Sequence, residues 1–598
     1  MNIITQIKSA AAATIESLYG IHLSPESVLI NQTKPEFEGD YTVVLFSFVK
    51  QLRKSPEALG QEIGEQLVKG WPDLFTDFNV IKGFLNLSVA DRYWQDFLEE
   101  NLGGTGKTAF GQLPATGERV MVEYSSPNTN KPLHLGHLRN NFLGYSITEI
   151  LKCAGNEVFS SCVVNDRGIH ICKSMIAWQM FSNGATPAST GIKGDHFVGQ
   201  YYVKFNDEYK LQVQALIDSG LEKELAEKQA PIMEATQQML LDWEAGKPEV
   251  IELWKKMNSW VYEGFDVTYN TIGTTFDKVY YESNTYLLGK DLVEQGLAKK
   301  VFYKKEDGSV WIDLTQDGLD EKLVRRSDGT SVYITQDIGL AEQKQKEFNI
   351  QESIYVVGDE QNYHFKVLKL ICQKLGLPSA DGIYHLSYGM VELPSGKMKS
   401  REGTVVDADD LIANMIEIAR QKTEELGKVS DFNEEELAVL YNMIGLGALK
   451  FFLLRVDPKK KMLFNPEESI DFHGFTGPFV QYTYARIKSI LRKLELQGEQ
   501  TATDKVATDL LKPEKEVLVA LEQYPALIQE AADEHDPSKI AIYVFNLAKL
   551  FNALYAELSI LNAESKQKKM LRSSIALLTG DTIKRSMALL GIEVPERM

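Results

Sequence analysis

Two histidines that bracket a leucine and a glycine, His134-Leu135-Gly136-His137, form the pattern with the clearest chemical meaning in the sequence. They follow a short apolar stretch at 120–124 and precede helical spacing over Asn140–Ala154. In that position the glycine lets a flat base or ribose approach the backbone. The imidazoles and the helix N-terminus can donate hydrogen bonds to phosphate oxygens. The pattern predicts a nucleotide site at His134, Gly136 and His137; the alternative is a pair of histidines that only caps a helix.

A second group of cations lies about 260 residues farther along, in Gly396-Lys397-Met398-Lys399-Ser400-Arg401. Lysines on a glycine-bounded loop can close over a pyrophosphate and neutralise it as it leaves. Taken alone, this segment is a charged surface turn. Together with the two histidines, it predicts the second half of a phosphate-binding site.

The elements that must position these groups alternate between strand and helix. Apolar runs occur at 120–124, Glu157–Val164, Ser353–Val357 and Ile383–Met390, with helical stretches between them. That alternation predicts a Rossmann-like parallel sheet that binds its ligands at the carboxyl ends of the strands. We assign residues 118–428 to this catalytic domain, with a helical insertion at about 190–265.

Two further domains flank the predicted sheet, which makes the fold class multidomain α/β. Residues 1–110 predict an N-terminal α/β module, with an extended stretch at Gly39–Val49, a helix after Ser55-Pro56 and a strand at Phe84–Val89. Residues 429–598 are almost wholly helical in pattern and predict a C-terminal all-α bundle. Within it, the apolar series from Ile540 to Leu558 fits one face of a long helix.

The composition is that of a folded soluble protein, with 44% apolar and 25% charged residues. No run of ~18 apolar residues predicts a transmembrane helix, and the N-terminus lacks the pattern of a secretion signal. We therefore expect a cytoplasmic protein without membrane contact. The four cysteines, Cys153, Cys162, Cys172 and Cys372, show no C-x-x-C spacing, so neither protein-bound zinc nor a disulfide is predicted.

The net charge of −19 argues against a nucleic-acid binder of the strongly basic kind, but it does not exclude a local basic track. Candidate tracks are Lys459–Lys461 and the later group Lys566, Lys568, Lys569 and Arg572. The alternative for each is a solvated face of a helix or loop.

The two phosphate-site motifs resemble the HIGH and KMSKS signatures of class I aminoacyl-tRNA synthetases. Three other segments are similar to the arginyl branch of that class: Asn165–Gly168, Ser327–Asp337 and Gly474–Ile487. Near the N-terminus, Gly39-Asp40 and Gly83–Asn86 resemble that branch's additional tRNA-contacting domain. The likeness runs from end to end, and the motifs occur in the order that the family shows.

This resemblance implies an arginine–tRNA ligase. Such an enzyme activates arginine with ATP and Mg²⁺ to arginyl-adenylate and transfers it to the 3′-terminal ribose of tRNA(Arg). It further implies that tRNA binds before activation and that the anticodon and the elbow of the tRNA are both recognised. We expect the chain to act as a monomer.

The resemblance also assigns site residues. A planar guanidinium calls for facing carboxylates, because paired charge-assisted hydrogen bonds discriminate it from lysine. The implied arginine-binding set is Glu123, Asn128, Tyr333, Asp337, Gln361 and Glu282. The implied catalytic set is His134, His137, Lys131, Lys397 and Lys399; the ATP-binding set is His134, Gly136, His137, Met398, Lys399 and Ser400. Contacts with tRNA are implied for Gln481, Tyr482 and Arg486, and no metal ligands are predicted.

One departure from the family pattern concerns the lysine loop, which reads Lys397-Met398-Lys399-Ser400-Arg401, so that the second lysine of KMSKS is displaced. Lys131, shortly before the HIGH motif, resembles a stand-in for it, and we state that substitution as a hypothesis. Two alternatives stay open: another class I synthetase of the cysteinyl kind, and a non-catalytic tRNA-binding paralogue. The first normally carries zinc, and the second is not expected to retain the polar groups of both motifs.

Overall fold

A five-stranded sheet lies at the centre of the chain and is formed by β5 (Arg119–Glu123), β6 (Glu157–Val164), β7 (Lys278–Tyr281), β11 (Glu352–Gly358) and β12 (Ile383–Tyr388). Its order is β12-β11-β5-β6-β7, and every neighbouring pair is parallel, which confirms the predicted sheet. The computed structural model describes residues 2–34, 36–102, 110–378, 380–392, 406–425, 427, 431–497 and 508–598.

Helix α5 (Leu135–Cys153) connects β5 to β6 and contacts both strands and β11. It is buried on almost every side because helices of the C-terminal part cover its other face. The helix begins at Leu135, five residues before the predicted start at Asn140, because His134 caps it. Strand β7 was not predicted; with four residues and one of them buried, its pattern is too short to recognise.

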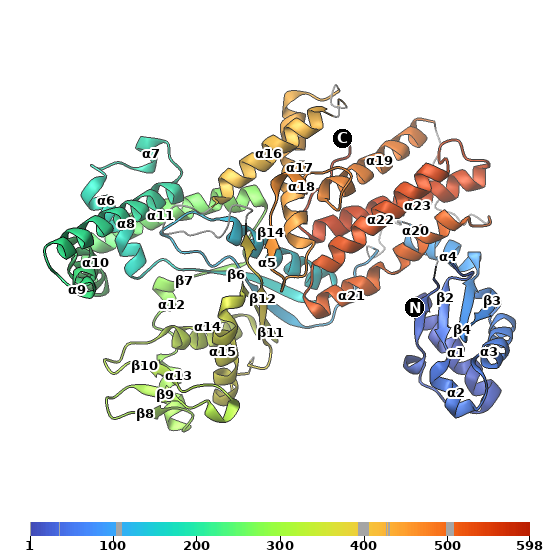
Figure 1. Cartoon of the computed structure of the whole chain (residues 1–598), viewed down its shortest axis with the longest axis horizontal. Helices are drawn as coiled ribbons and strands as arrows, with labels where there is room; N and C mark the ends of the chain where they lie inside the picture. The colour runs from blue at the N-terminus through green and yellow to red at the C-terminus, as the bar shows by residue number, and fades with distance from the viewer. Residues whose placement is uncertain are drawn as a thin grey trace.

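Between β6 and β7 the chain is helical, as predicted for the insertion. The elements are α6 (Ile169–Phe181), α7 (Pro187–Thr190), α8 (Gly194–Asp218), α9 (Lys223–Gln229), α10 (Pro231–Glu244) and α11 (Pro248–Ile272). Figure 1 shows them gathered at one end of the molecule, opposite the N-terminal module.

A small antiparallel sheet that the sequence analysis did not predict follows β7. After α12 (Glu282–Thr285) and α13 (Lys290–Ala298), it consists of β8 (Tyr303–Lys304), β9 (Val310–Ile312) and β10 (Lys322–Arg325). These strands pack in a core of their own with α14 (Tyr333–Phe348) and α15 (Asn362–Leu375), the helices before and after β11. Strands of two to four residues leave too little pattern to predict.

The N-terminal module is an antiparallel sheet of order β1-β2-β4-β3 covered by helices. Its strands are β1 (Ile30–Gln32), β2 (Tyr41–Val44), β3 (Phe75–Ile81) and β4 (Phe84–Val89), and its helices are α1 (Ile3–Tyr19), α2 (Phe46–Leu52), α3 (Pro56–Gly70) and α4 (Asp91–Asn101). The predicted cap at Ser55 is confirmed, since its hydroxyl accepts the Ala58 amide at 3.2 Å. The extended stretch predicted at Gly39–Val49 is partly wrong: the strand ends at Val44, and α2 begins at Phe46, where Phe48 turns into the core.

The C-terminal part is helical, as predicted. Its helices are α17 (Glu434–Leu454), α18 (Pro466–Ser469), α19 (Gly477–Leu496), α20 (Lys512–Glu522), α21 (Tyr524–Glu534), α22 (Ser538–Glu557) and α23 (Lys566–Leu589). Helix α16 (Ala408–Glu425) precedes them, inside the range that we assigned to the catalytic domain. The predicted long helix is α22, which buries Ile540, Val544, Leu547 and Leu554. A short parallel pair, β13 (Val391–Glu392) with β14 (Met462–Leu463), ties this part to the end of the central domain.

Helix α17 is long and apolar enough to cross a membrane, but 72% of its most apolar window is buried inside the protein. Helices α16, α19 and α5 pack against its apolar surface, so it is a core helix.

Two of the four cations in the later basic track, Lys568 and Arg572, are buried, whereas Lys566 is exposed and Lys569 is partly exposed. Glu514 of α20 is fully buried and accepts hydrogen bonds from Lys568 at 2.6 Å and Arg572 at 2.7 Å, both on α23. Since these two cations are consumed in holding the bundle together, they cannot form a phosphate track. Lys459–Lys461 remains exposed.

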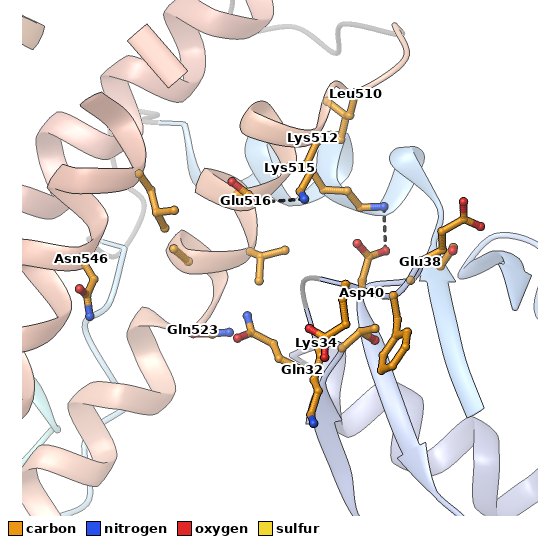
Figure 2. Close-up of a pocket in the computed structure, with 18 of the residues that line it drawn as sticks. Gln32, Lys34, Glu38, Asp40, Leu510, Lys512, Lys515, Glu516, Gln523 and Asn546 are labelled. Carbon is orange, nitrogen blue, oxygen red and sulfur yellow. Dashed lines mark ion pairs between the residues drawn. The ribbon is translucent and has the colours of Figure 1, made fainter. Parts of the chain in front are cut away.

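The N-terminal module docks on the C-terminal helices (Figure 1). The joint encloses a groove of about 800 Å³ between the β1–β2 connection and α20–α22. Figure 2 shows Lys515 of α20 reaching across it to the Asp40 carboxylate at 2.7 Å. The same ammonium donates to the carbonyl of Val89 at 2.9 Å, and the buried Glu522 accepts the amide of Ile3 at 2.6 Å.

Candidate active site at the carboxyl ends of the central strands

The chain turns sharply as it leaves β5, at the middle of the sheet. Ser125 and Ser126 both adopt positive φ angles, 75° and 43°. Such angles cost non-glycine residues roughly 1–3 kcal/mol and persist where surrounding contacts hold them. Here Asn140 of α5 holds the turn: its side-chain oxygen accepts the Ser125 amide at 2.5 Å, and its nitrogen donates to the Val356 carbonyl of β11 at 2.7 Å.

The two predicted histidines form a reciprocal cap on α5. His134 Nδ1 accepts the amide of Gly136 at 3.1 Å, and His137 Nδ1 accepts the amide of His134 at 3.1 Å. The ring centroids lie 3.9 Å apart. A Cβ at Gly136 would stand 3.0 Å from the His134 ring, so glycine keeps this cap open. Because both Nδ1 atoms accept backbone hydrogen bonds, both neutral rings carry their proton on Nε2.

These rings are uncharged at neutral pH. Burial, reinforced by the nearby Lys131, lowers the pKa of His134 to about 4. Burial and the neighbouring His134 and Lys131 hold the pKa of His137 well below its ordinary value. The histidines therefore offer Nε2–H donors to an anion without adding charge, and Lys131 supplies the positive charge in this part of the site. Lys131 and His134 line a cavity of about 360 Å³ that α8 closes from the other side.

The predicted lysine loop, with Lys397, Met398, Lys399 and Ser400, lies outside the described residues. The chain beyond it returns to the histidine motif. Val406 accepts the amide of Leu135 at 3.1 Å, and the amide of Ala408 donates to Leu133 at 3.0 Å. Residues 406–408 thus run beside 133–135, where His134 and Asp407 form an antiparallel bridge.

A second, smaller cavity of about 150 Å³ opens at the ends of β5 and β11. Two of the predicted arginine-binding residues meet in it: Glu123, at the end of β5, and Asp337, on α14. The Asp337 carboxylate lies 2.7 Å from Nε2 of His364 on α15. The remaining lining residues are Ser126, Val163, Asn165, Leu340, Tyr355, Phe365 and Leu368. The cavity thus combines two carboxylates with an apolar and aromatic wall, which suits an extended cation with an apolar stem.

Glu282 does not line this cavity, but it is close enough for the charge of Asp337 to affect its pKa. Burial, with smaller contributions from Asp166 and Asp337 and against the opposing effect of Arg167, raises the pKa of Glu282 to about 7. Asp166 fixes the local chain: its carboxylate accepts the Ser283 amide at 2.8 Å and the Tyr262 hydroxyl at 2.9 Å. Glu282 is therefore a carboxyl group that changes charge near neutral pH.

The other three predicted arginine-binding residues lie outside the cavity wall. Tyr333 begins α14 and is 73% exposed, one helical turn before Asp337. Asn128 follows the turn after β5 and is bridged to Asn165, and Gln361 precedes α15; both are exposed. All three side chains are open to solvent, and Asn128 adjoins the cavity through its bridge to Asn165.

One residue in this region was missed from sequence. Lys344 of α14 is 1% exposed and donates to the carboxylate of Glu123. A lysine in an amphipathic helix is ordinarily expected at the surface. The available signal was its spacing, since Asp337, Leu340 and Lys344 share one face of α14.

The predicted tRNA-contacting residues divide between core and surface. Gln481 is fully buried and donates to the carbonyls of Met443 at 3.1 Å and Glu593 at 2.8 Å. The structure thus gives it a structural role in place of the predicted direct contact. Tyr482 and Arg486 line a cavity of about 300 Å³ together with Tyr555, Arg492, Lys493 and Arg597. The Arg486 guanidinium lies 5.0 Å from the Tyr482 ring centroid, which makes this a basic and aromatic surface.

Asp195, His196 and Asp409 have ligand atoms close enough to share a metal ion. An internal cation already pairs with both carboxylates of this group, because Lys193 Nζ lies 3.0 Å from Asp195 and 2.6 Å from Asp409. The cluster joins α8 to the start of α16 and serves as a structural joint.

Comparison with known proteins gives a consistent result along the whole chain. Residues 106–465 match the family model of the class I (R) tRNA synthetase catalytic domain, residues 480–598 that of the DALR anticodon binding domain, and residues 3–89 that of the arginyl tRNA synthetase N-terminal domain.

Individual relatives agree with these matches. The chain is 53% identical to an arginine–tRNA ligase of Flavobacterium psychrophilum, over 96% of this chain and 97% of that one. It is 52% identical to one of Amoebophilus asiaticus, over 100% of both chains. Among solved structures, Thermus thermophilus arginyl-tRNA synthetase superposes with a TM-score of 0.78 at 25% identity, covering 99% of both chains.

The cap on α5 leads to a prediction that separates its structural role from its chemistry. His134→Asn keeps a side-chain acceptor for the Gly136 amide, whereas His134→Ala removes it, at a typical cost of ~1 kcal/mol. Hydrogen–deuterium exchange in a peptide spanning 130–140 should be faster in the alanine variant and near wild type in the asparagine variant. Equally fast exchange in both would contradict the cap.

Proposed function

Since the chain belongs to the arginyl-tRNA synthetase family, we propose how its residues divide the work of arginine–tRNA ligation. The chain is an arginine–tRNA ligase of class I, which uses ATP, arginine and tRNA. We assign the two steps of that reaction to the histidine motif, the acidic cavity and the C-terminal helices.

In the first step ATP enters as its magnesium complex and lies against the N-terminus of α5. The carboxylate of arginine attacks the α-phosphorus in line, an oxygen–phosphorus bond forms, and pyrophosphate leaves. The Nε2–H groups of His134 and His137 donate to phosphate oxygens as their negative charge grows, and Gly136 leaves room for the nucleotide. Lys131 and the loop with Lys397, Met398, Lys399 and Ser400 supply the positive charge. The site thus contributes positioning and charge neutralisation, without a covalent nucleophile.

The arginine side chain occupies the cavity between β5 and α14. Glu123 and Asp337 face the guanidinium from two sides, and Glu282 adds a third carboxylate when it is ionised. Tyr333, Asn128 and Gln361 close over the ligand from the rim, with Asn128 and Gln361 directed to its α-amino group. The observation that carries this assignment is that one cavity, beside the capped helix, brings together Glu123 and Asp337, which are 214 positions apart in the sequence.

In the second step the 3′-terminal ribose of the tRNA attacks the adenylate carbonyl and releases AMP. We propose that the basic and aromatic surface around Tyr482 and Arg486 contacts the tRNA, and that bound tRNA is required before activation. The chain is proposed to act as a monomer in the cytoplasm.

Amino-acid-dependent exchange of pyrophosphate into ATP tests this function directly. We expect exchange with arginine alone among the amino acids, and only when tRNA(Arg) is present. His134→Asn, which keeps the helix cap, should lower the exchange rate ~100-fold or more by removing the Nε2 donor. Filter binding of tRNA should stay within about two-fold of wild type in the same variant. Exchange with cysteine, or none under any condition, would refute the proposal.

The pKa of Glu282 gives a pH dependence. Below pH 7 the carboxyl is mostly protonated and cannot pair with a guanidinium, so the KM for arginine should fall ~10-fold between pH 6 and pH 8. The KM for ATP, measured in the same assays, is the internal control and should stay constant, since the histidines are neutral across this range. Glu282→Gln should give a high arginine KM that does not vary with pH. A wild-type arginine KM that is constant over this range would exclude Glu282 from binding.

A further inference from the structure

Lys344 is one of the few lysines in the described residues that is almost completely removed from solvent, and it lies directly behind the acidic cavity. Its side chain is 1% exposed, and Nζ donates to Oε2 of Glu123. The ammonium also faces two tyrosine rings, 4.6 Å from the centroid of Tyr355 and 6.0 Å from that of Tyr280. It is thus held by one carboxylate and an aromatic wall.

Three strands and a helix build this arrangement. Glu123 ends β5 and pairs in register with Tyr355 of β11, and Tyr280 belongs to β7 at the edge of the sheet. Helix α14 crosses the ends of these strands. It presents Asp337 toward the cavity and, seven residues later on the same face, Lys344 behind Glu123. One helix therefore places both an anion that lines the cavity and a cation that is not among the residues lining it.

The pairing fixes where the Glu123 carboxylate lies. Its side chain is only 12% exposed, and a carboxylate buried to that degree is costly unless an opposite charge meets it. Lys344 meets it at Oε2, and this contact holds the carboxylate at the end of β5, where it lines the acidic cavity.

We propose that Lys344 is a positioning residue for arginine recognition, an internal ammonium that fixes the position and orientation of the Glu123 carboxylate. The inference rests on the proposed use of this cavity as the guanidinium site. It goes beyond that function by assigning a role to a residue that no ligand touches. A purely structural ion pair would contribute to stability without a selective effect on arginine.

A double-mutant cycle tests whether Lys344 acts through Glu123. The variants are Lys344→Met, Glu123→Gln and the two combined, with Lys344→Arg as the matched control that keeps a cation. Each single change leaves a buried charge alone and lowers stability, whereas the combined variant removes both charges and tolerates burial better. Thermal unfolding and tRNA filter binding establish that each variant is folded.

The readout is the KM for arginine against the KM for ATP in tRNA-dependent pyrophosphate exchange. We expect Lys344→Met to raise the arginine KM ~10-fold or more while the ATP KM changes by less than ~2-fold. In the Glu123→Gln background, Lys344→Met should raise the arginine KM by less than ~2-fold, because the carboxylate that Lys344 positions is absent. Lys344→Arg should stay within ~3-fold of wild type.

Two results would overturn the inference: equal rises in both KM values, or an effect of Lys344→Met that is undiminished when Gln stands at position 123. If Lys344→Met alone does not fold, two measurements of the arginine KM still test the inference. The combined variant should match Glu123→Gln within ~2-fold, and Lys344→Arg should stay within ~3-fold of wild type. Failure of the proposed function is distinguishable, because in that case the wild-type protein itself would show no exchange with arginine.

Discussion

An ionised side chain is costly to bury unless an opposite charge meets it, and in this chain such pairings join segments that are far apart in sequence. Lys344 and Glu123 connect α14 to the middle strand of the sheet. Glu514, with Lys568 and Arg572, connects α20 to α23 in the C-terminal bundle, and Lys193 connects the insertion to α16 through Asp409. Because a misplaced element would leave one of these charges alone, the same constraint that specifies the fold also sets the positions of the site residues.

The two parts of the candidate site handle charge in opposite ways. The cap on α5 offers neutral imidazole donors, held in one tautomer by backbone amides, beside the positive charge of Lys131. The cavity between β5 and α14 offers the carboxylates of Asp337 and Glu123, the second paired with an internal ammonium. Under the proposed assignment ATP and arginine carry opposite charges, so this separation favours a different side of the β5 turn for each.

Much of this arrangement was accessible from the sequence, and the omissions have physical reasons. The parallel sheet, the helical insertion and the long helix α22 follow from periodicity, because each buries a regular apolar face. Strands β7 to β10 were not predicted, because two to four residues are too few to show the alternation of apolar and polar residues that marks a strand. Gln481 was predicted to contact tRNA and no role was predicted for Lys344, since a buried polar side chain is identified by partners that are distant in sequence. Residues with a motif around them were thus easier to name than buried residues that are identified only by their contacts.

The seam between the N-terminal module and the C-terminal helices has a consequence for how such proteins diversify. Lys515 contacts both Asp40 and the Val89 carbonyl, and Glu522 accepts the amide of Ile3. Polar groups of each domain therefore have hydrogen-bond partners in the other. If one domain alone were exchanged between relatives, these charged groups would lose their partners at the interface. The two domains are therefore expected to be inherited as a pair, and a functional chimera would have its crossover points inside the central domain, not at this seam.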